Sequence, residues 1–352
     1  MNIKIIGTGL YLPPKIETSK ETAEFIGKNE NWIISKTGVV ERRRSDIDVD
    51  KMGAIAASMA LEDNSVPDLI INASGVPKQS IPDTSVFFQK ELGLNNIPCF
   101  SIHGTCLSFL IAVNNATSLI NTGVYERILI ISADRGTIGR NPKEPESAAL
   151  LGDGAAAILM ERGESKNYHY WKMNTWSEGA NLTEVRGGGT NLHPQDPKTK
   201  VEDNLFSMDG PAIYKIARKR AYKMVQKTFK SVEFEKSDVA WVIPHQASEK
   251  GVSAYHEYGG FDKNKIINIV SKTGNCVSAS MPMAFVTAVQ DGRIQRGDLL
   301  YFIGTGAGLS MACTLLSLSL KHISEPTRPL YISYAGLCLK KKKVGGGGWG
   351  GG

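Results

Sequence analysis

A series of elements recurs in the same order at an offset of about 170 residues, and this internal repeat constrains the fold more than any other feature of the chain. Each copy starts with an apolar run that ends in small polar residues. A second strand, a small-residue helix, a third strand and a closing strand then follow. The paired segments are 68–75 and 239–246, 100–106 and 267–275, 107–122 and 278–293, 128–134 and 299–305, and 155–160 and 311–318.

The strands of the repeat lack the polar and apolar alternation that is typical of a sheet with one wet face. Continuous apolar strands separated by helices indicate sheets that are covered on both faces. We therefore predict an α/β protein with two similar halves, residues 1–165 and 210–320, packed against each other. The stretch between them, 166–209, is rich in Gly, Asn, Thr and charge and is predicted to be a surface connection. A cleft between two halves is a usual place for a small-molecule site.

Charge and hydropathy exclude two classes of partner. The chain has 41 Lys and Arg against 35 Asp and Glu, but six of the basic residues and one acidic residue fall in 321–352. Residues 1–320 therefore carry a net charge of only +1, which provides no basic field for nucleic acid. No apolar run approaches the ~20 residues of a membrane-spanning helix, so no membrane span is expected.

The N-terminus and the cysteines predict a cytoplasmic protein. Residues 1–7 enter an apolar strand at once and show no signal-peptide pattern. The five cysteines have irregular positions and no C-x-x-C spacing, which argues against a disulfide framework and against a zinc site.

The last segment, 321–352, differs from the rest of the chain in composition. It ends in four lysines, a valine and a glycine-rich run around one tryptophan, and composition of this kind cannot build a packed core. We predict an extension that is foreign to the fold. The alternative is a flexible or membrane-touching tail.

Residues 211–229 predict an amphipathic helix with a strongly basic side. Its basic residues are Lys215, Lys219, Arg220, Lys223 and Lys227. Such a face is either simply solvated or serves as a docking surface for an acidic partner.

Three polar residues with catalytic chemistry fall at the ends of predicted strands. Cys106 follows a Gly-Thr turn and is expected on the first turn of the next helix, where unpaired N–H groups would make the thiol ionise more easily. His245 follows an apolar strand, and Asn275 lies in a second strand-to-helix turn. Each residue alone also fits a structural role, because Cys is often buried and Asn often serves turn geometry.

Six motifs in order resemble the β-ketoacyl-ACP synthase III family over residues 1 to about 318. They are IGTGLYLP at 6–13, WIISKTGVVERR at 32–43, GTC at 104–106, GDGAA at 152–156, PHQA at 244–247 and TGN at 273–275. The resemblance implies a duplicated thiolase-type α/β fold, in which each half has a mixed sheet and helices are layered between and outside the sheets.

The resemblance also implies the chemistry. The Cys106 thiolate would take an acyl group from a thioester, and a malonyl thioester would then bind and lose CO₂. His245 and Asn275 would donate hydrogen bonds to the enolate oxygen, while the backbone N–H groups of Cys106 and Ala307 would form an oxyanion hole. No metal or other cofactor is implied. Acyl-CoA and malonyl-ACP would be the substrates, and the acyl carrier protein and a second copy in a homodimer would be the partners.

The expected substrate-binding residues are Trp32, Lys36, Tyr214 and Ser248. Several positions depart from the family's usual pattern. This chain has Lys36 where the family usually has Arg, Ser248 where it has Asn, and Ala307 where it has Gly. Pro145 occupies the place where members that use coenzyme A have an Arg. These departures leave open whether the primer is acetyl-CoA or a longer acyl group from a carrier protein.

The sequence therefore predicts a condensing enzyme that transfers an acyl group to Cys106 and then performs a decarboxylative Claisen condensation. A non-decarboxylating acyltransferase on the same scaffold is the alternative. A thiol protease also uses Cys, His and Asn, but its sequence signatures are missing. A non-catalytic subunit would have no need for the three polar residues.

Overall fold

Two mixed β-sheets form the framework of the structure, a computed structural model that describes residues 1–62 and 66–319. The first sheet has the strand order β1-β7-β6-β4-β5. Strands β6, β4 and β5 are parallel, whereas β7 is antiparallel to both β6 and β1. The strands are β1 (Lys4–Tyr11), β4 (Leu69–Asn72), β5 (Cys99–Ser101), β6 (Arg127–Arg135) and β7 (Asp153–Glu161).

The second sheet repeats this topology. Its order is β11-β12-β13-β8, with β11 and β12 parallel and β13 antiparallel to both β12 and β8. The strands are β8 (Tyr168–Thr175), β11 (Trp241–Pro244), β12 (Leu299–Gly306) and β13 (Ser310–Ser317). Strands β8, β13, β12 and β11 thus correspond to β1, β7, β6 and β4, and the predicted duplicated α/β fold with mixed sheets is confirmed.

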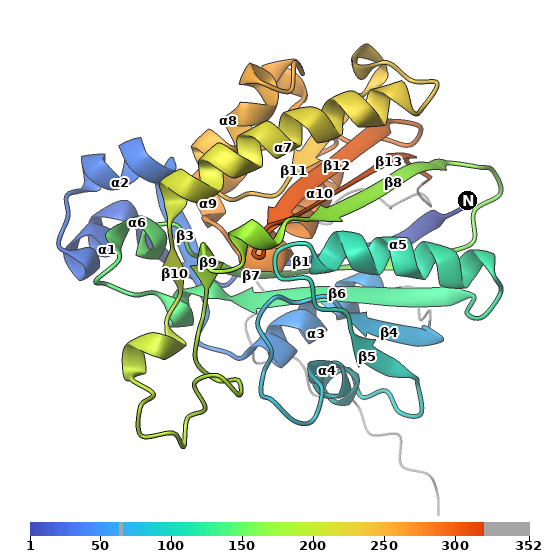
Figure 1. Ribbon diagram of the computed structural model, residues 1–352. Coiled ribbons are helices and arrows are strands. Elements are labelled where there is room, and N and C mark those ends of the chain that lie inside the picture. The colour runs from blue at the N-terminus through green and yellow to red at the C-terminus, as the bar shows by residue number, and fades with distance from the viewer. Residues whose placement is uncertain (63–65, 320–352) are drawn as a thin grey trace, which may run out of the picture. The chain divides into compact units, whose positions relative to one another are not determined.

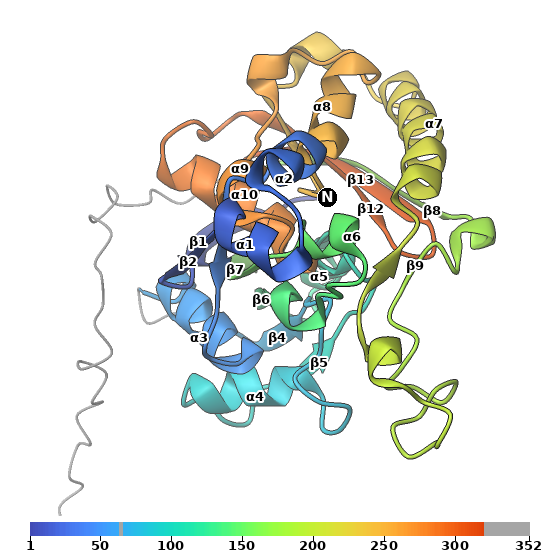
Figure 2. The same ribbon diagram turned by 90° about the vertical axis from the view of Figure 1, so that its left-hand side faces the viewer.

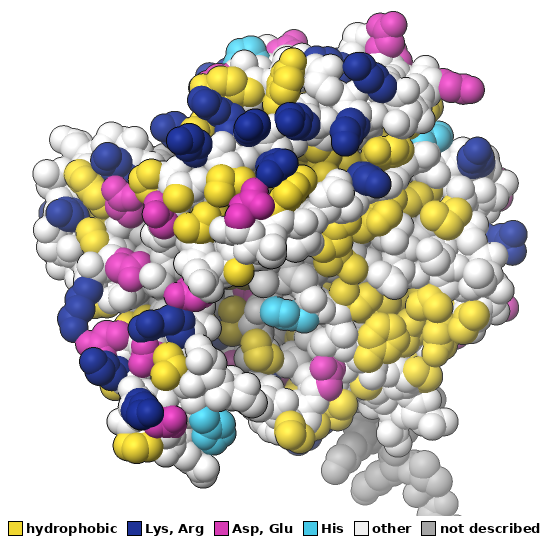
Figure 3. All heavy atoms as spheres, in the orientation of Figure 1, with side chains coloured by type: hydrophobic (Ala, Val, Ile, Leu, Met, Phe, Trp, Pro, Cys, Tyr) yellow, Lys and Arg dark blue, Asp and Glu magenta, His cyan; other side chains and the backbone are white. Residues whose placement is uncertain are grey.

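Five layers result from the way helices cover these sheets (Figure 1, Figure 2). Helices α5 (Ser108–Asn121) and α10 (Ser280–Gln290) lie between the two sheets. Helices α3 (Val49–Ala60) and α4 (Thr84–Glu91) cover the outer face of the first sheet. Helices α7 (Gly210–Lys230) and α8 (Glu249–Glu257) cover the outer face of the second, and Figure 3 shows a row of Lys and Arg side chains along α7.

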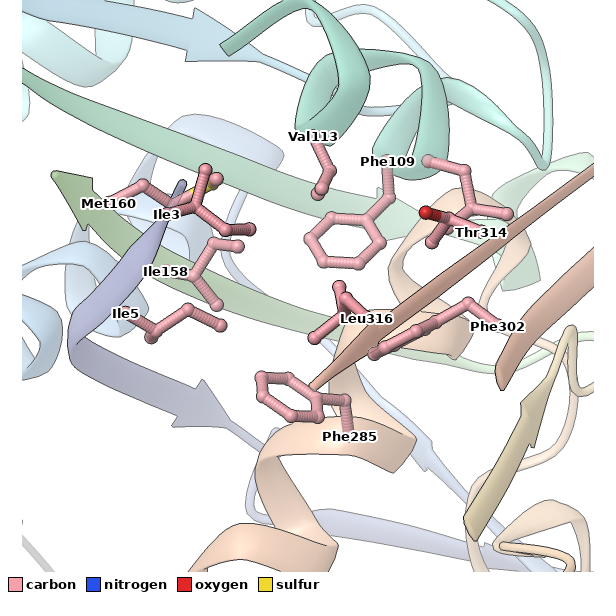
Figure 4. A pocket seen from close by; sticks show the side chains of 11 residues that line it. Ile3, Ile5, Phe109, Val113, Ile158, Met160, Phe285, Phe302, Thr314 and Leu316 are labelled. Atoms are coloured by element: carbon pink, nitrogen blue, oxygen red, sulfur yellow. The ribbon is translucent and has the colours of Figure 1, made fainter. Parts of the chain in front are cut away.

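Successive side chains of the apolar strands point to opposite faces, which explains why each sheet can be covered on both faces. In β6, Ile128 and Ile130 point into the core between the sheets, whereas Leu129 and Ile131 pack under α3. Figure 4 shows the middle of the inner core, where aromatic rings from α5, α10 and β12 meet aliphatic side chains of β1 and β7. The void left there is only about 10 Å³, so α5 and α10 are held in fixed positions.

Smaller elements close one end of the molecule (Figure 2). They are β2 (Lys15–Thr18), α1 (Ser19–Ile26), α2 (Glu30–Thr37), β3 (Glu41–Arg44), α6 (Pro145–Ala148), α9 (Val270–Thr273) and the pair β9 (Thr183–Glu184) and β10 (Ser207–Met208). Among the described helices, none has the length and apolar character needed to cross a bilayer. The predicted foreign extension, 321–352, lies outside the described residues.

Two expectations about the second half differ from the structure. The stretch 166–209 is not only a surface connection, because β8 completes the second sheet as β1 completes the first. The expected strand at 267–275 is reduced to an isolated bridge between Val242 and Ile266, followed by α9. The buried side chain of Gln246 is the physical reason, since its amide bonds Ile267 O at 3.1 Å and the Ile269 N–H at 2.9 Å in place of a neighbouring strand.

Candidate active site

Cys106 lies in a tight turn between β5 and α5, two residues before the helix rather than on its first turn. The preceding Thr105 has a left-handed backbone with φ of 53°, which is a strained conformation for a β-branched residue. Ser108 holds the turn together, because its hydroxyl donates to Thr105 O at 2.7 Å and accepts from the Gly104 N–H at 3.0 Å. The cysteine is therefore presented on a rigid backbone.

The protein raises the pKa of the Cys106 thiol to about 12. Desolvation by the surrounding atoms is the main cause, although the residue as a whole is only partly buried, and the nearby Asp134 carboxylate raises the pKa further. The backbone N–H of Cys106 opposes this shift but does not overcome it. The expectation of an easily ionised cysteine is therefore wrong for the resting protein, which holds a neutral thiol.

His245 follows the last residue of β11 and is almost completely buried. Its backbone N–H donates to Ile303 O at 3.0 Å in β12, which fixes the end of the strand. In the described part of the chain, Nδ1 of the imidazole is buried without a hydrogen-bond partner. Burial lowers the pKa of His245 to about 4, so the ring is neutral at physiological pH and has one N–H to donate.

The side-chain amide of Asn275 has a defined orientation. Its Oδ1 accepts from the Val277 N–H at 2.9 Å and from the Ser280 hydroxyl at 3.3 Å. Because the oxygen is occupied, the amide N–H₂ remains as the group that can donate to a ligand. The Asn275 backbone is bonded to the segment before β7, with its N–H on Leu150 O at 2.8 Å and its carbonyl on the Gly152 N–H at 3.0 Å.

Glycines allow the turns from the two halves to approach closely. A Cβ atom at Gly304 of β12 would lie 3.1 Å from the Cβ of His245 and 3.2 Å from Cδ2 of Leu107, the residue after the nucleophile. One at Gly306 would lie 2.6 Å from Oγ1 of Thr105. Strand β12 thus brings the cysteine turn and the histidine turn together.

A cavity of about 480 Å³ adjoins these turns, a size that is typical of small-molecule sites. His245, Asn275 and Thr305 are among the residues that line it, and α7 and α8 contribute many of the others. Of the expected substrate-binding residues, Lys36, Tyr214 and Ser248 line the cavity.

Three of the expected site residues, Trp32, Cys106 and Ala307, are not part of the cavity lining. Trp32 packs beside the apolar cluster of α1, α2 and α6, with the Lys28 ammonium 5.4 Å from its ring centroid. Cys106 is partly accessible but does not line this cavity. In residues 1–62 and 66–319, no group of three or more His, Cys, Asp or Glu side chains is arranged to hold a metal ion.

Asp134 is a buried site residue that sequence reasoning overlooked. It follows the apolar run of β6, where the strand becomes polar, and this position was the available signal. Its Oδ1 accepts the N–H groups of Gly75 and Val76 at 2.9 and 2.8 Å, and its Oδ2 accepts the Ala279 N–H at 3.0 Å. The carboxylate therefore ties a loop of the first half to the segment that follows Asn275 in the second half.

A duplicated five-layer α/β framework thus carries a cysteine turn in its first half, and a histidine turn and an asparagine turn in its second.

Comparisons with known proteins identify the family. The family profile described as 3-Oxoacyl-[acyl-carrier-protein (ACP)] synthase III matches residues 100–179, and the one described as its C terminal part matches residues 229–318. The β-ketoacyl-[acyl-carrier-protein] synthases III of Rickettsia bellii and Rickettsia felis are each 31% identical over 323 residues, which cover 90% of this chain and 99% of each relative. The crystal structure of the Aquifex aeolicus 3-oxoacyl-[acyl-carrier-protein] synthase III has a TM-score of 0.81 at 27% identity, covering 90% of this chain and 99% of that one.

The chain belongs to the β-ketoacyl-ACP synthase III family. It is a transferase of fatty acid biosynthesis, a condensing enzyme of the acyltransferase type. The family and the fold that the sequence motifs implied are therefore confirmed.

Proposed function

We propose that Cys106 is the acyl-carrying nucleophile and that His245 and Asn275 promote decarboxylation of a malonyl thioester. The main support is that β12 brings the cysteine turn and the histidine turn together, and that Asn275 lines the same cavity as His245. A thiol, a neutral imidazole and an oriented amide thus come from the two halves of the fold. The roles of the three residues in the chemistry follow from what each can donate or accept.

In the first step, the sulfur of Cys106 attacks the carbonyl carbon of an acyl thioester. A new carbon–sulfur bond forms, the bond to the donor's sulfur breaks, and the donor leaves as a thiol that takes the proton from Cys106. Because the resting thiol has a raised pKa and the imidazole of His245 is a weak base, direct proton transfer to the leaving sulfur is the simplest route. The step needs no cofactor.

In the second step, the bond between the α-carbon and the carboxylate of a bound malonyl thioester breaks and releases CO₂. The electron pair moves into an enolate, whose oxygen accepts hydrogen bonds from His245 and from the free amide N–H₂ of Asn275. The enolate carbon then attacks the acyl carbon on Cys106. A carbon–carbon bond forms, the carbon–sulfur bond breaks, and the released sulfur is protonated.

The backbone N–H groups of Cys106 and Ala307 would stabilise the tetrahedral oxyanion. Ala307 directly follows Gly306, the last residue of β12, and Gly306 packs against Thr105. In the described part of the chain, neither N–H donates to a main-chain carbonyl, so both are available to a ligand. The methyl group of Ala307 does not affect this use of its backbone.

Lys36, Tyr214 and Ser248 would bind the thioester-bearing arm of the substrates along the cavity. Trp32, on α2, would then contribute only outside the cavity. The substrates in this proposal are an acyl thioester on coenzyme A or a carrier protein and malonyl-ACP.

The two-substrate reaction distinguishes this function from its alternative. Incubation of the enzyme with an acyl thioester and a malonyl thioester should give a β-ketoacyl product and CO₂ in equal amounts, as measured by mass spectrometry and by trapped carbonate. An acylated product without CO₂ would instead support a non-decarboxylating acyltransferase.

The basic side of α7 is the proposed docking surface for an acidic carrier protein. Lys215, Lys219, Lys223 and Lys227 are exposed at four-residue spacing, so they form one stripe on the helix next to the cavity wall. Arg220 is different, because it bonds Glu178 at 2.8 Å and lies over the ring of Trp176.

Charge reversal at Lys215, Lys219 and Lys223 should lower kcat/KM for malonyl-ACP by about tenfold or more, because steering and binding by opposite charges are lost. The rate with malonyl-CoA should stay within about twofold. Reversal of the exposed Lys20, Lys51 and Lys90 on other helices is the matched control. Equal loss with both substrates, or equal loss in the control, would contradict this docking surface.

We also propose a homodimer that forms at the open edge of the first sheet. Strand β5 lies at the edge, and apolar side chains around it are exposed: Phe100 at 39%, Val86 at 44% and Ile81 at 84%. An uncovered sheet edge flanked by apolar surface favours pairing with a second strand.

Phe100→Asp should convert the dimer to a monomer in light scattering, because it places a charge in the paired surface. Ile16→Asp, which alters a similarly exposed residue on β2, should leave the mass unchanged. A monomeric wild-type protein, or a Phe100→Asp protein with the wild-type mass, would exclude this interface.

A cytoplasmic location is proposed as well. The four cysteines in the described part of the chain are free, and the nucleophile requires a reduced thiol.

A further inference from the structure

Arg42 in β3 is a completely buried guanidinium whose position the proposed chemistry does not explain. Its Nη1 donates to Ala149 O at 2.7 Å and to Leu151 O at 3.1 Å. In the described part of the chain, Nε and Nη2 are also buried but have no partner. Burial lowers the pKa of Arg42 to about 10, so the group is still a cation at neutral pH. Burying a charged guanidinium costs free energy, and two hydrogen bonds offset only part of this cost. A role for these two bonds would explain why the charge is kept there.

The segment that Arg42 holds is the same one that holds Asn275. Arg42 binds the carbonyls of residues 149 and 151, and Asn275 is bonded to Leu150 O and to the Gly152 N–H. Leu151 and Asn275 also form an isolated β-bridge. Residues 149–152 thus lie between the Arg42 side chain of the first half and the Asn275 turn of the second half. This segment and Asn275 are more than 120 residues apart in the sequence.

The charges around Arg42 favour a fixed guanidinium. Asp153 is buried one residue beyond the braced segment, where it accepts from Ser45 and Thr137. Arg140 is a like charge that acts against the Arg42 cation, but Arg140 pairs with Glu17, and the Glu17 carboxylate is also close enough to stabilise Arg42. A planar guanidinium in such surroundings has less freedom than an ammonium group would have.

We propose that Arg42 is a positioning residue that orients the Asn275 amide toward the enolate by bracing residues 149–152. The inference rests on the proposed role of Asn275 in decarboxylation. Arg42 does not contact the substrate in this view. It fixes the backbone of Asn275, while Val277 and Ser280 fix the side-chain oxygen, so that the N–H₂ group points in one direction.

The proposal predicts that loss of Arg42 separates the two half-reactions. Acyl transfer to Cys106 uses a turn that Arg42 does not touch, whereas enolate stabilisation needs the Asn275 amide. A purely structural role would lower both half-reactions together, along with the melting temperature.

The test compares Arg42→Met, Arg42→Lys and the matched control Arg44→Lys, which changes an exposed arginine on the same strand. Acyl-adduct formation is followed by intact mass and CO₂ release from malonyl thioester by carbonate trapping. We expect Arg42→Met to lose about tenfold or more in CO₂ release with acylation within about threefold, and Arg42→Lys to lie between it and wild type. Arg44→Lys should resemble wild type in both. If Arg42→Met does not fold, the lysine variant carries the test.

A double-mutant cycle separates failure of this inference from failure of the proposed function. If Arg42 acts through Asn275, Arg42→Lys should have no further effect on CO₂ release in an Asn275→Ala background. Additive losses, or equal losses in both half-reactions, would overturn the inference while leaving the role of Asn275 intact. Wild-type CO₂ release by Asn275→Ala would instead contradict the proposed function.

Discussion

Cys106→Ala should abolish acyl-adduct formation, with a loss of at least about 10⁴-fold in condensation, because the variant has no atom that can hold the acyl group. Intact-protein mass spectrometry after mixing with an acyl thioester is the direct measurement. The wild type should gain the mass of one acyl group, and the alanine variant should gain none. Cys99→Ala is the matched control, since Cys99 is also partly accessible and free.

The alkylation rate of Cys106 should also depend on pH in a characteristic way. Because desolvation and Asp134 raise the pKa of Cys106 to about 12, alkylation by iodoacetamide should keep accelerating up to at least pH 10. An ordinary exposed cysteine would level off above its pKa of about 8.5. A plateau below pH 9, or an acyl adduct that persists in Cys106→Ala, would contradict the environment or the role assigned to this thiol.

The double substitution His245→Ala with Asn275→Ala should suppress CO₂ release by roughly 10²–10³ for each donor removed, while the acyl adduct on Cys106 still forms. The physical reason is that negative charge develops on the thioester oxygen only during decarboxylation. Asn275→Asp is a sharper single variant, because its carboxylate still accepts from Val277 and Ser280 but places negative charge beside the enolate. Trapped carbonate and intact mass measure the two half-reactions separately.

Two matched variants control for general damage. His169→Ala removes a histidine of β8 that lies against Phe234, and Asn115→Ala removes an exposed asparagine of α5 that bonds its own helix. Both should retain wild-type CO₂ release. The pKa of His245 is lowered to about 4, so the neutral donor persists down to about pH 5, and its protonation should cause no loss between pH 8 and 6. Normal decarboxylation in the double variant would exclude these roles.

The sequence predicted most of the framework because its signals are local. The strands at 69–72, 127–135, 241–244 and 299–306 each contain a continuous apolar run, and the helix at 210–230 has one basic and one apolar side. Strand β8 was not predicted, because an edge strand with mixed aromatic and polar residues resembles a surface segment. The absent strand at 267–275 depends on Gln246, whose amide takes the place of a neighbouring strand.

The environment of each site residue depends on contacts between distant parts of the chain. Desolvation and Asp134 decide the ionisation of Cys106, and the sequence pattern around the cysteine contains neither. The hydrogen bonds of Arg42 span 107 and 109 residues, so no local pattern could connect this residue with Asn275. Trp32 was expected at the substrate, but its position relative to the cavity is set by the packing of three small helices.

The sequence by itself determined the duplicated α/β architecture and the chemical identity of the thiol, the imidazole and the amide, because apolar runs and turn residues act over a few positions. Only the tertiary structure decided which nitrogen or oxygen of those groups is free, how readily they ionise, and which buried arginine braces one of them. Those properties arise from desolvation and from hydrogen bonds between the two halves, and they exist only once the halves have packed together.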